Sequence, residues 1–260
     1  MIRKHEGRIE YVQFVSFQSF NLSHGIFMRH GGVSSHPWSS LNVGSTVGDD
    51  PAHVHENIRK IFSNFHRLPG SIHQVWQVHS ASVALATSPD GGEIPHKADA
   101  IISSSSLVTL FMRFADCVPI MLYDPENHAI GIAHAGWLGT VRKTATSLTR
   151  AMVEKFGSKP GKIVAGLGPS IGPDHYAVGD DVVGQIIRAF TVGGDAHIKR
   201  VDGSYYLDLW SANRDLLERE GVSQIEVAEI CTACHLDDWF SHRAENGRTG
   251  RFGAMIALKP

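Results

Sequence analysis

The chain has 260 residues, in which 24 Lys and Arg residues nearly balance 26 Asp and Glu residues, so its formal net charge at pH 7 is -2. This balance excludes the strong basic field on which sequence-independent nucleic-acid binding depends, and nucleic acid is not an expected partner. The chain is 42% hydrophobic, but no apolar run approaches the ~18 residues needed to span a bilayer, which excludes a membrane span.

Strand-like and helical segments follow one another along the chain. Short runs that alternate between apolar and polar residues, or that are wholly apolar, predict strands. These runs lie at residues 9–15, 25–29, 74–79, 98–104, 107–113, 119–124, 128–136, 162–168, 225–230 and 253–259. Amphipathic segments with an apolar period of about 3.6 residues predict helices. These segments lie at residues 54–65, 140–156, 179–190 and 208–219.

Residues typical of helix ends support these boundaries. Asp50 followed by Pro51 is typical of an N-cap and a first helical turn, and Asp208 is a second candidate N-cap. Gly157 and Gly221 follow the second and fourth predicted helices, at positions where glycine commonly ends a helix. The sequence therefore predicts where these helices begin and end.

The order of the elements favours one mixed domain. Strands and helices do not alternate strictly, and the sequence lacks the glycine fingerprint of a dinucleotide-binding fold. This favours an α+β sandwich over a doubly wound sheet, with residues 1–260 as a single domain because no repeat or clear linker interrupts them. Residues 1–14 lack the apolar stretch of a secretory signal, so we expect the protein in the cytoplasm.

Three cysteines are present, Cys117, Cys231 and Cys234. An odd number in a chain of this length argues against a disulfide framework and leaves metal or thiol chemistry. Residues 231–235 spell the C-x-x-C-H attachment motif of a c-type haem, but that chemistry requires export. A thioredoxin-like redox pair is expected at a helix N-terminus after the first strand, which does not fit this position. We therefore interpret this pair of cysteines as structural.

His79, Cys117 and His134 each stand at the end of a strand-like run and could converge at one sheet edge. Two imidazoles and one thiolate form a zinc ligand set with a fourth position open for water, and one thiolate cancels only half of the charge of Zn²⁺, so that water would ionise near neutral pH. Other interpretations are a surface histidine, a buried apolar cysteine, or Cys117 as the nucleophile of a hydrolase or deamidase. Asp116 could orient a ligand histidine or cap a turn.

Nine short motifs occur in order along most of the chain. They are R-H-G-G-V-S (29–34), S-S-L-N (39–42), V-H-E-N-I-R (54–59), Q-V-H (77–79), A-D-C-V-P (115–119), A-H-A-G-W (133–137), C-T-A-C (231–234), F-S-H-R (240–243) and T-G-R-F (249–252). With these motifs the chain resembles the YfiH/YlmD family. This family is also called the laccase-domain or polyphenol oxidase family, and it includes purine nucleoside phosphorylases related to mammalian FAMIN.

The resemblance implies a four-layer α/β/β/α sandwich with mixed sheets. It implies a zinc ion, with copper as the alternative metal, held by His79, Cys117 and His134, which would also be the catalytic residues. It further implies phosphorolysis of adenosine, inosine, guanosine or methylthioadenosine and hydrolytic deamination of adenosine, so purine nucleosides and phosphate are the expected partners. A copper-dependent polyphenol oxidase and a non-enzymatic ligand-binding protein are the alternatives.

Polar residues at family motif positions are candidates for substrate binding. Arg29, Asn42 and Arg251 are expected to line the pocket. The family commonly reads H-A-G-W-R-G, whereas this chain has Leu138 in place of that arginine. If the arginine contacts an anion, its loss weakens phosphate use. Arg142 lies one helical turn later and could reach the same place.

Overall fold

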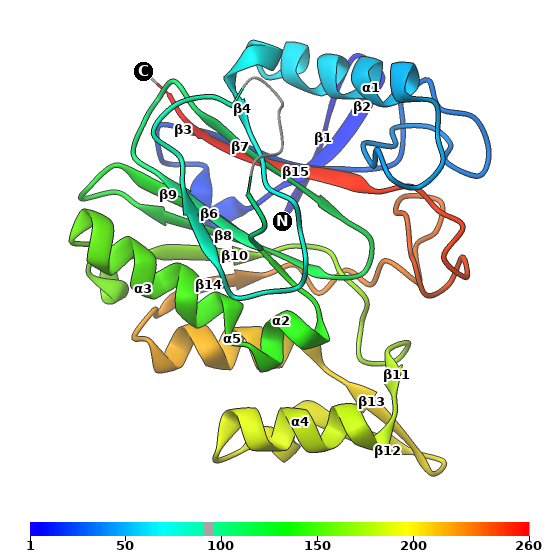
Figure 1. The fold of residues 1–260 in the computed structure, drawn as a ribbon, viewed down its shortest axis with the longest axis vertical. Helices are drawn as coiled ribbons and strands as arrows, with labels where there is room; N and C mark the ends of the chain where they lie inside the picture. Colours follow the sequence, from blue (N-terminus) through cyan, green and yellow to red (C-terminus); the bar gives the residue numbers. More distant parts are fainter. Residues whose placement is uncertain (91–95, 260) are drawn as a thin grey trace.

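The computed structural model describes residues 1–90 and 96–259, and two six-stranded mixed sheets form its centre (Figure 1). The first sheet has the order β1 (Ile2–Glu6), β2 (Ile9–Gln13), β3 (Leu22–Phe27), β15 (Phe252–Leu258), β7 (Thr109–Phe114) and β4 (Ile72–His73). The second has the order β14 (Gln224–Val227), β10 (Val164–Leu167), β8 (Val118–Asp124), β9 (Ala129–Ala135), β6 (Ala100–Ser103) and β5 (Val83–Leu85).

Helices cover the outer faces of the two sheets. Helix α1 (Pro51–Asn64) packs on the first sheet, where Phe62 belongs to the same buried cluster as Phe111 of β7. Helices α3 (Thr144–Phe156) and α5 (Leu209–Arg219) cover the second sheet. Phe114 and Met121, from opposite sheets, share the apolar core between them. These layers confirm the α/β/β/α sandwich.

The local signals at helix ends act as the sequence predicts. The Asp50 side chain accepts a hydrogen bond from the backbone of Ala52 at 2.8 Å, and Pro51 is the first residue of α1. Asp208 caps α5 by accepting from the backbone amides of residues 210 and 211. Gly157 ends α3 with a φ of 70°, which glycine adopts without steric cost. Short-range capping chemistry was therefore sufficient to locate these ends.

The single helix predicted at 140–156 is wrong, because the structure divides this segment into α2 (Trp137–Val141) and α3. Lys143 lies between them with a left-handed φ of 62°. The Thr144 hydroxyl donates to the carbonyl of Gly139 at 2.9 Å. That carbonyl would accept from the amide of Lys143 in a continuous helix, so a side chain replaces the helical bond at the break.

The strand predicted at 74–79 is also wrong, because this segment is a loop in which Trp76 makes one isolated bridge. The amide of Val78 donates to the carboxylate of Asp99 at 3.1 Å instead of to a strand carbonyl. Alternating apolar residues cannot reveal this difference, because it depends on a carboxylate far along the chain. His79 therefore reaches its position from a loop.

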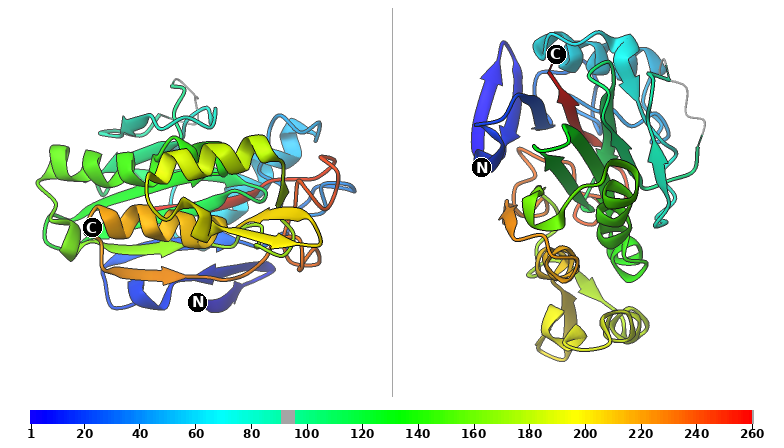
Figure 2. Two further views of the ribbon diagram at one scale, coloured as in Figure 1. Left: turned by 90° about the horizontal axis from the view of Figure 1, so that it is seen from below. Right: turned by 90° about the vertical axis from the view of Figure 1, so that its left-hand side faces the viewer.

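A third, small sheet lies outside the sandwich. It has the order β11 (Ala177–Val178), β13 (Ser204–Leu207) and β12 (Ile198–Val201), and it lies beside α4 (Asp180–Phe190). Figure 2 shows these elements at the end of the molecule opposite α1. The sequence did not predict their strands, which are short and largely exposed. In the described part of the chain, no helix is long and apolar enough to cross a bilayer.

His24 on β3 is a buried histidine whose protonation opposes folding. Its Nε2 accepts a hydrogen bond from the amide of Phe14 at 2.9 Å, and burial lowers its pKa to about 4. Between about pH 6.5 and pH 4 the unfolded chain therefore binds a proton at this site that the folded chain does not, so stability falls as the pH falls.

We expect this site to reduce the free energy of unfolding by about 2–3 kcal/mol between pH 7 and pH 4.5. His24→Gln keeps an acceptor for the Phe14 amide and does not titrate. Urea unfolding at both pH values should show a smaller pH-dependent loss in the variant than in the wild type. Equal losses would contradict the assignment.

Candidate metal and substrate site

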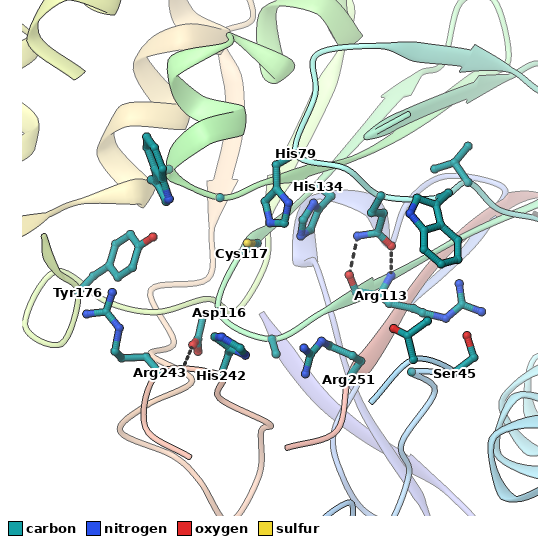
Figure 3. Close-up of a pocket in the computed structure, with 18 residues that line it drawn as sticks. Ser45, His79, Arg113, Asp116, Cys117, His134, Tyr176, His242, Arg243 and Arg251 are labelled. Carbon is teal, nitrogen blue, oxygen red and sulfur yellow. Dashed lines mark hydrogen bonds between the residues drawn. The ribbon is translucent and has the colours of Figure 1, made fainter. Parts of the chain in front are cut away.

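A pocket of about 550 Å³ opens where the ends of both sheets meet the C-terminal segment (Figure 3). This volume lies in the range of small-molecule sites. The lining residues come from segments that are distant in the sequence, at 44–46, 75–79, 113–117, 134–137, 176, 242–243 and 251. The fold, rather than any one motif, therefore builds this pocket.

The predicted triad comes together in the wall of the pocket. One ligand atom from each of His79, Cys117 and His134 lies within 4.8 Å of the other two, and Figure 3 shows the two rings and the sulfur side by side. Antiparallel pairing of β8 with β9 places His134 opposite Pro119. Cys117 directly precedes β8, so the register of two neighbouring strands aligns a thiol with an imidazole.

Asp99 orients one histidine of the triad. Its carboxylate lies 3.0 Å from Nδ1 of His134 and also accepts bonds from the amides of Val78 and Ser80. Burial alone would raise the pKa of Asp99, but the bonds from His134, Ser80 and Val78 outweigh it and lower that pKa to about 2. The ionised carboxylate of Asp99 binds Nδ1 of His134, so Nε2 is the ring nitrogen that remains available next to Cys117.

Cys117 and His134 stabilise each other in their charged forms. Burial would raise the pKa of the Cys117 thiol, but His134 and His79 outweigh it and lower that pKa to about 6. Burial would lower the pKa of His134, but the Cys117 thiolate and the Asp99 carboxylate raise it to about 9. A thiolate beside two imidazoles, one of them held by a carboxylate, is a donor set that fits Zn²⁺.

Gly136 leaves the space that the Cys117 sulfur occupies. A Cβ atom added at Gly136 would lie 2.5 Å from Sγ of Cys117. The backbone there has a φ of -81°, which alanine adopts freely, so the contact alone opposes the substitution. Glycine at this position therefore leaves room for the thiolate, which a larger residue would displace.

Gly136→Ala is expected to displace the thiolate and weaken zinc affinity about 10–100-fold, the range found when the surroundings of metal ligands are disturbed. Competition with a chromogenic chelator measures this affinity. Gly161→Ala is the matched control, because the nearest atom to its added Cβ is 3.9 Å away. An unchanged affinity in Gly136→Ala would contradict this role.

Of the predicted substrate residues, Arg251 lines the pocket and Asn42 does not. Asn42 is fully buried, and its Oδ1 accepts from the amides of Gly44 and Arg251, both at 2.8 Å. A Cβ at Gly44 would lie 2.7 Å from Cγ of Arg251, so this glycine packs against the arginine stem. Asn42 thus supports the pocket wall from behind.

Arg29 and Arg142 lie outside the lining and hold other backbone segments. The Arg29 guanidinium donates to the carbonyls of Ser39 and Leu236 and joins an early loop to the C-terminal segment. Arg142 donates to the carbonyl of His79 at 2.6 Å and so fixes a triad residue. Leu138 is also absent from the lining.

Two further arginines, Arg113 and Arg243, line the pocket, and the sequence did not predict them. Burial lowers the pKa of Arg113 to about 10, so its guanidinium stays charged at neutral pH. The Arg243 guanidinium lies 4.9 Å from the ring centre of Tyr176. Arg243 belongs to the F-S-H-R motif, which was a usable signal, whereas Arg113 ends a predicted strand and carried none. Together with Arg251, three cations face one cavity.

Asp116, next to Cys117, does not bond a triad histidine. Its carboxylate accepts from the hydroxyl of Thr232 and the amide of Arg243, both at 2.7 Å. Neither interpretation left open by the sequence is confirmed: these bonds run to residues 116 and 127 positions away, so Asp116 ties the C-terminal segment to the loop that carries Cys117. Asp99 has the histidine-orienting role instead.

Comparison with known proteins identifies the family of the chain. The family described as “Multi-copper polyphenol oxidoreductase laccase” matches residues 23–259. Purine nucleoside phosphorylase YlmD of Bacillus subtilis is 36% identical over 245 residues, covering 90% of this chain and 88% of that protein. Purine nucleoside phosphorylase YfiH of Escherichia coli is 32% identical over 230 residues, covering 88% of this chain and 91% of that protein.

Solved structures agree as well. The crystal structure of YlmD from Geobacillus stearothermophilus superposes with a TM-score of 0.92 at 32% sequence identity, covering 99% of this chain and 98% of that chain. The family match, the sequence identities and the superposed fold thus confirm the resemblance that the motifs indicated. The chain belongs to the YfiH/YlmD family of multi-copper polyphenol oxidoreductase laccase proteins.

Proposed function

We propose that the chain is a zinc-dependent purine nucleoside enzyme whose main reaction is phosphorolysis. The observation that carries this proposal is that one pocket combines the His79, Cys117 and His134 triad with three arginines. Arginine binds phosphate through paired, charge-assisted hydrogen bonds. The printed names of the Bacillus subtilis and Escherichia coli relatives support the same reaction.

In phosphorolysis, a phosphate oxygen forms a bond to C1′ of the ribose while the glycosidic bond to N9 of the purine breaks. The electron pair of that bond goes to the purine, which leaves with a proton, and ribose 1-phosphate is the other product. Arg251, Arg243 and Arg113 would hold the phosphate dianion next to the ribosyl carbon, which becomes electron-poor as the bond breaks. Trp76, whose side chain is half exposed at the rim, could stack on the purine.

His79, Cys117 and His134 would hold the zinc ion, which supplies Lewis-acid stabilisation of developing negative charge when it is bound. Within this set Asp99 keeps the Nδ1 proton of His134 and thereby fixes the orientation of the ring. The carbonyl of His79 is held by Arg142, which limits the movement of the loop that carries the third ligand. The chain therefore prepares its donor atoms before the substrate arrives.

We extend the proposal to hydrolytic deamination of adenosine at the same site. In this reaction a water oxygen bonds to C6 of adenine and the bond between C6 and the exocyclic amino nitrogen breaks. The amino group takes a proton and leaves as ammonia, which gives inosine. A set of one thiolate and two neutral imidazoles leaves a divalent ion with net positive charge, which suits the activation of water. Deamination needs no phosphate, so an assay without phosphate separates it from phosphorolysis.

Incubation of the zinc-loaded protein with adenosine, with and without phosphate, tests both reactions. We expect adenine and ribose 1-phosphate only when phosphate is present, and inosine in both cases. Chromatography of the bases and nucleosides identifies the products. If zinc-loaded protein formed neither adenine nor inosine from adenosine, and released no free base from inosine, guanosine or methylthioadenosine in the presence of phosphate, the proposed function would be refuted.

A cysteine hydrolase is a second candidate, favoured by the lowered pKa of Cys117. In that reaction the thiolate bonds to a substrate carbonyl or amidine carbon, and the bond from that carbon to an amine leaving group breaks as the amine takes a proton from His134. Water then hydrolyses the bond to sulfur and frees the thiolate. Metal removal decides between the two. The zinc enzyme loses turnover on dialysis against a chelator and regains it with zinc, whereas the cysteine hydrolase keeps turnover without metal and loses it on alkylation of Cys117.

A further inference from the structure

A second cluster of metal-binding side chains lies apart from the triad. One ligand atom from each of His175, Cys231 and Cys234 lies within 4.8 Å of the other two. Nδ1 of His175 lies 3.4 Å from the Cys234 sulfur and 3.8 Å from the Cys231 sulfur. In residues 1–90 and 96–259, this cluster and the triad are the two sets of three such residues that meet this criterion.

Two backbone segments are joined to build the cluster. Residues 170 and 231 form a parallel bridge, and the amide of Thr232 donates to the carbonyl of Ser170 at 3.0 Å. Further along, the amide of Gly172 donates to the Cys231 sulfur at 3.2 Å. The loop then turns back so that His175 faces both cysteines. The backbone of residues 170–175 thus holds Cys231 in place and brings His175 to the two cysteines.

We propose that His175, Cys231 and Cys234 form a second zinc site. The C-x-x-C spacing suits two thiolates on one ion, and two thiolates with an imidazole match zinc rather than a hard cation that prefers oxygen ligands. Two thiolates also cancel the charge of Zn²⁺, whereas the single thiolate of the triad does not. We assign this second ion a structural role, because its three ligands lie outside the pocket lining and an ion neutralised by two thiolates would activate water less than the ion of the triad. His175 and Cys234 are exposed, so the ion can enter from solvent.

The second site lies next to two segments that support the substrate pocket. Tyr176 follows His175 and lines the substrate pocket. Thr232 follows Cys231 and donates to Asp116, the neighbour of the triad cysteine. A zinc ion here would link the two segments that support this side of the pocket. It would also assign a role to the C-T-A-C motif, for which sequence reasoning gave only a structural interpretation.

Metal counting tests the second site without reference to turnover. Each protein is loaded with zinc under reducing conditions, desalted and analysed by plasma mass spectrometry. We expect two zinc ions per chain in the wild type, and one in Cys234→Ser and in His175→Ala. Cys117→Ser should also bind one, and Cys117→Ser combined with Cys234→Ser should bind none. His175→Ala leaves both thiols in place, so its loss of one ion separates metal binding from thiol chemistry.

One zinc ion in the wild type that Cys234→Ser and His175→Ala both retain would overturn the proposal. A disulfide between Cys231 and Cys234 in the zinc-loaded protein, detected by peptide mass spectrometry after alkylation, would also overturn it. Cys117→Ser counts the zinc of the triad separately from the zinc of the second site. The two proposals can therefore fail independently of each other.

Discussion

Cys117→Ser is expected to lose the zinc of the triad and at least about a hundredfold in phosphorolysis. Disturbing only the surroundings of a metal ligand costs about 10–100-fold in affinity or activity, and removal of a ligand should cost more. The substitution also removes the single thiolate, so the two imidazoles that remain carry no charge to offset that of the ion. Zinc content and the initial rate of ribose 1-phosphate formation are to be measured on the same preparation.

Cys234→Ser is the matched control, because it makes the same change of thiol to hydroxyl outside the triad. It is expected to retain the triad zinc and most of its turnover. If Cys117→Ser kept the triad zinc, or if wild-type protein freed of metal turned over at the rate of loaded protein, the role assigned to the triad would be wrong.

Arg251→Met is expected to raise the KM for phosphate about 10–100-fold. Hydrogen bonds to charged groups contribute about 1.5–3 kcal/mol, and the methionine keeps the apolar stem that packs on Gly44. Deamination uses no phosphate, so its rate should fall much less. Phosphorolysis rates at varied phosphate concentration give the KM for phosphate. The rate of inosine formation without phosphate gives the rate of deamination.

The control for this change is Arg59→Met, at an exposed arginine on α1 whose partner is Glu56. It should leave both reactions unchanged. Equal losses of phosphorolysis and deamination in Arg251→Met would show that Arg251 supports the pocket as a whole and does not bind phosphate.

Local chemistry made much of the fold predictable from sequence. Asp50 and Asp208 are N-caps whose bonds run to residues two or three positions away, so a short window of sequence contains the whole interaction. The break at Lys143 was not predictable in this way. It depends on the hydroxyl of Thr144 and on the carbonyl of Ser80, which that hydroxyl also contacts at 2.8 Å. An interaction with a distant segment overrides a regular apolar period.

The candidate site shows the same division between local and distant information. Asp116 was considered as the histidine partner because it adjoins Cys117, but the structure gives that bond to Asp99, which is 35 positions from His134. Arg29 matches a family motif, yet it binds backbone carbonyls 10 and 207 positions away. Motif order identified the triad residues, whereas their partners required the strand register and the loop paths.

Anomalous X-ray scattering from crystals of the zinc-loaded protein, recorded on both sides of the zinc absorption edge, tests the triad most directly. A peak is expected about 2.3 Å from Sγ of Cys117 and about 2.1 Å from Nε2 of His134 and from one ring nitrogen of His79. An active zinc-loaded protein whose crystals show no peak within bonding distance of these three atoms would contradict this expectation.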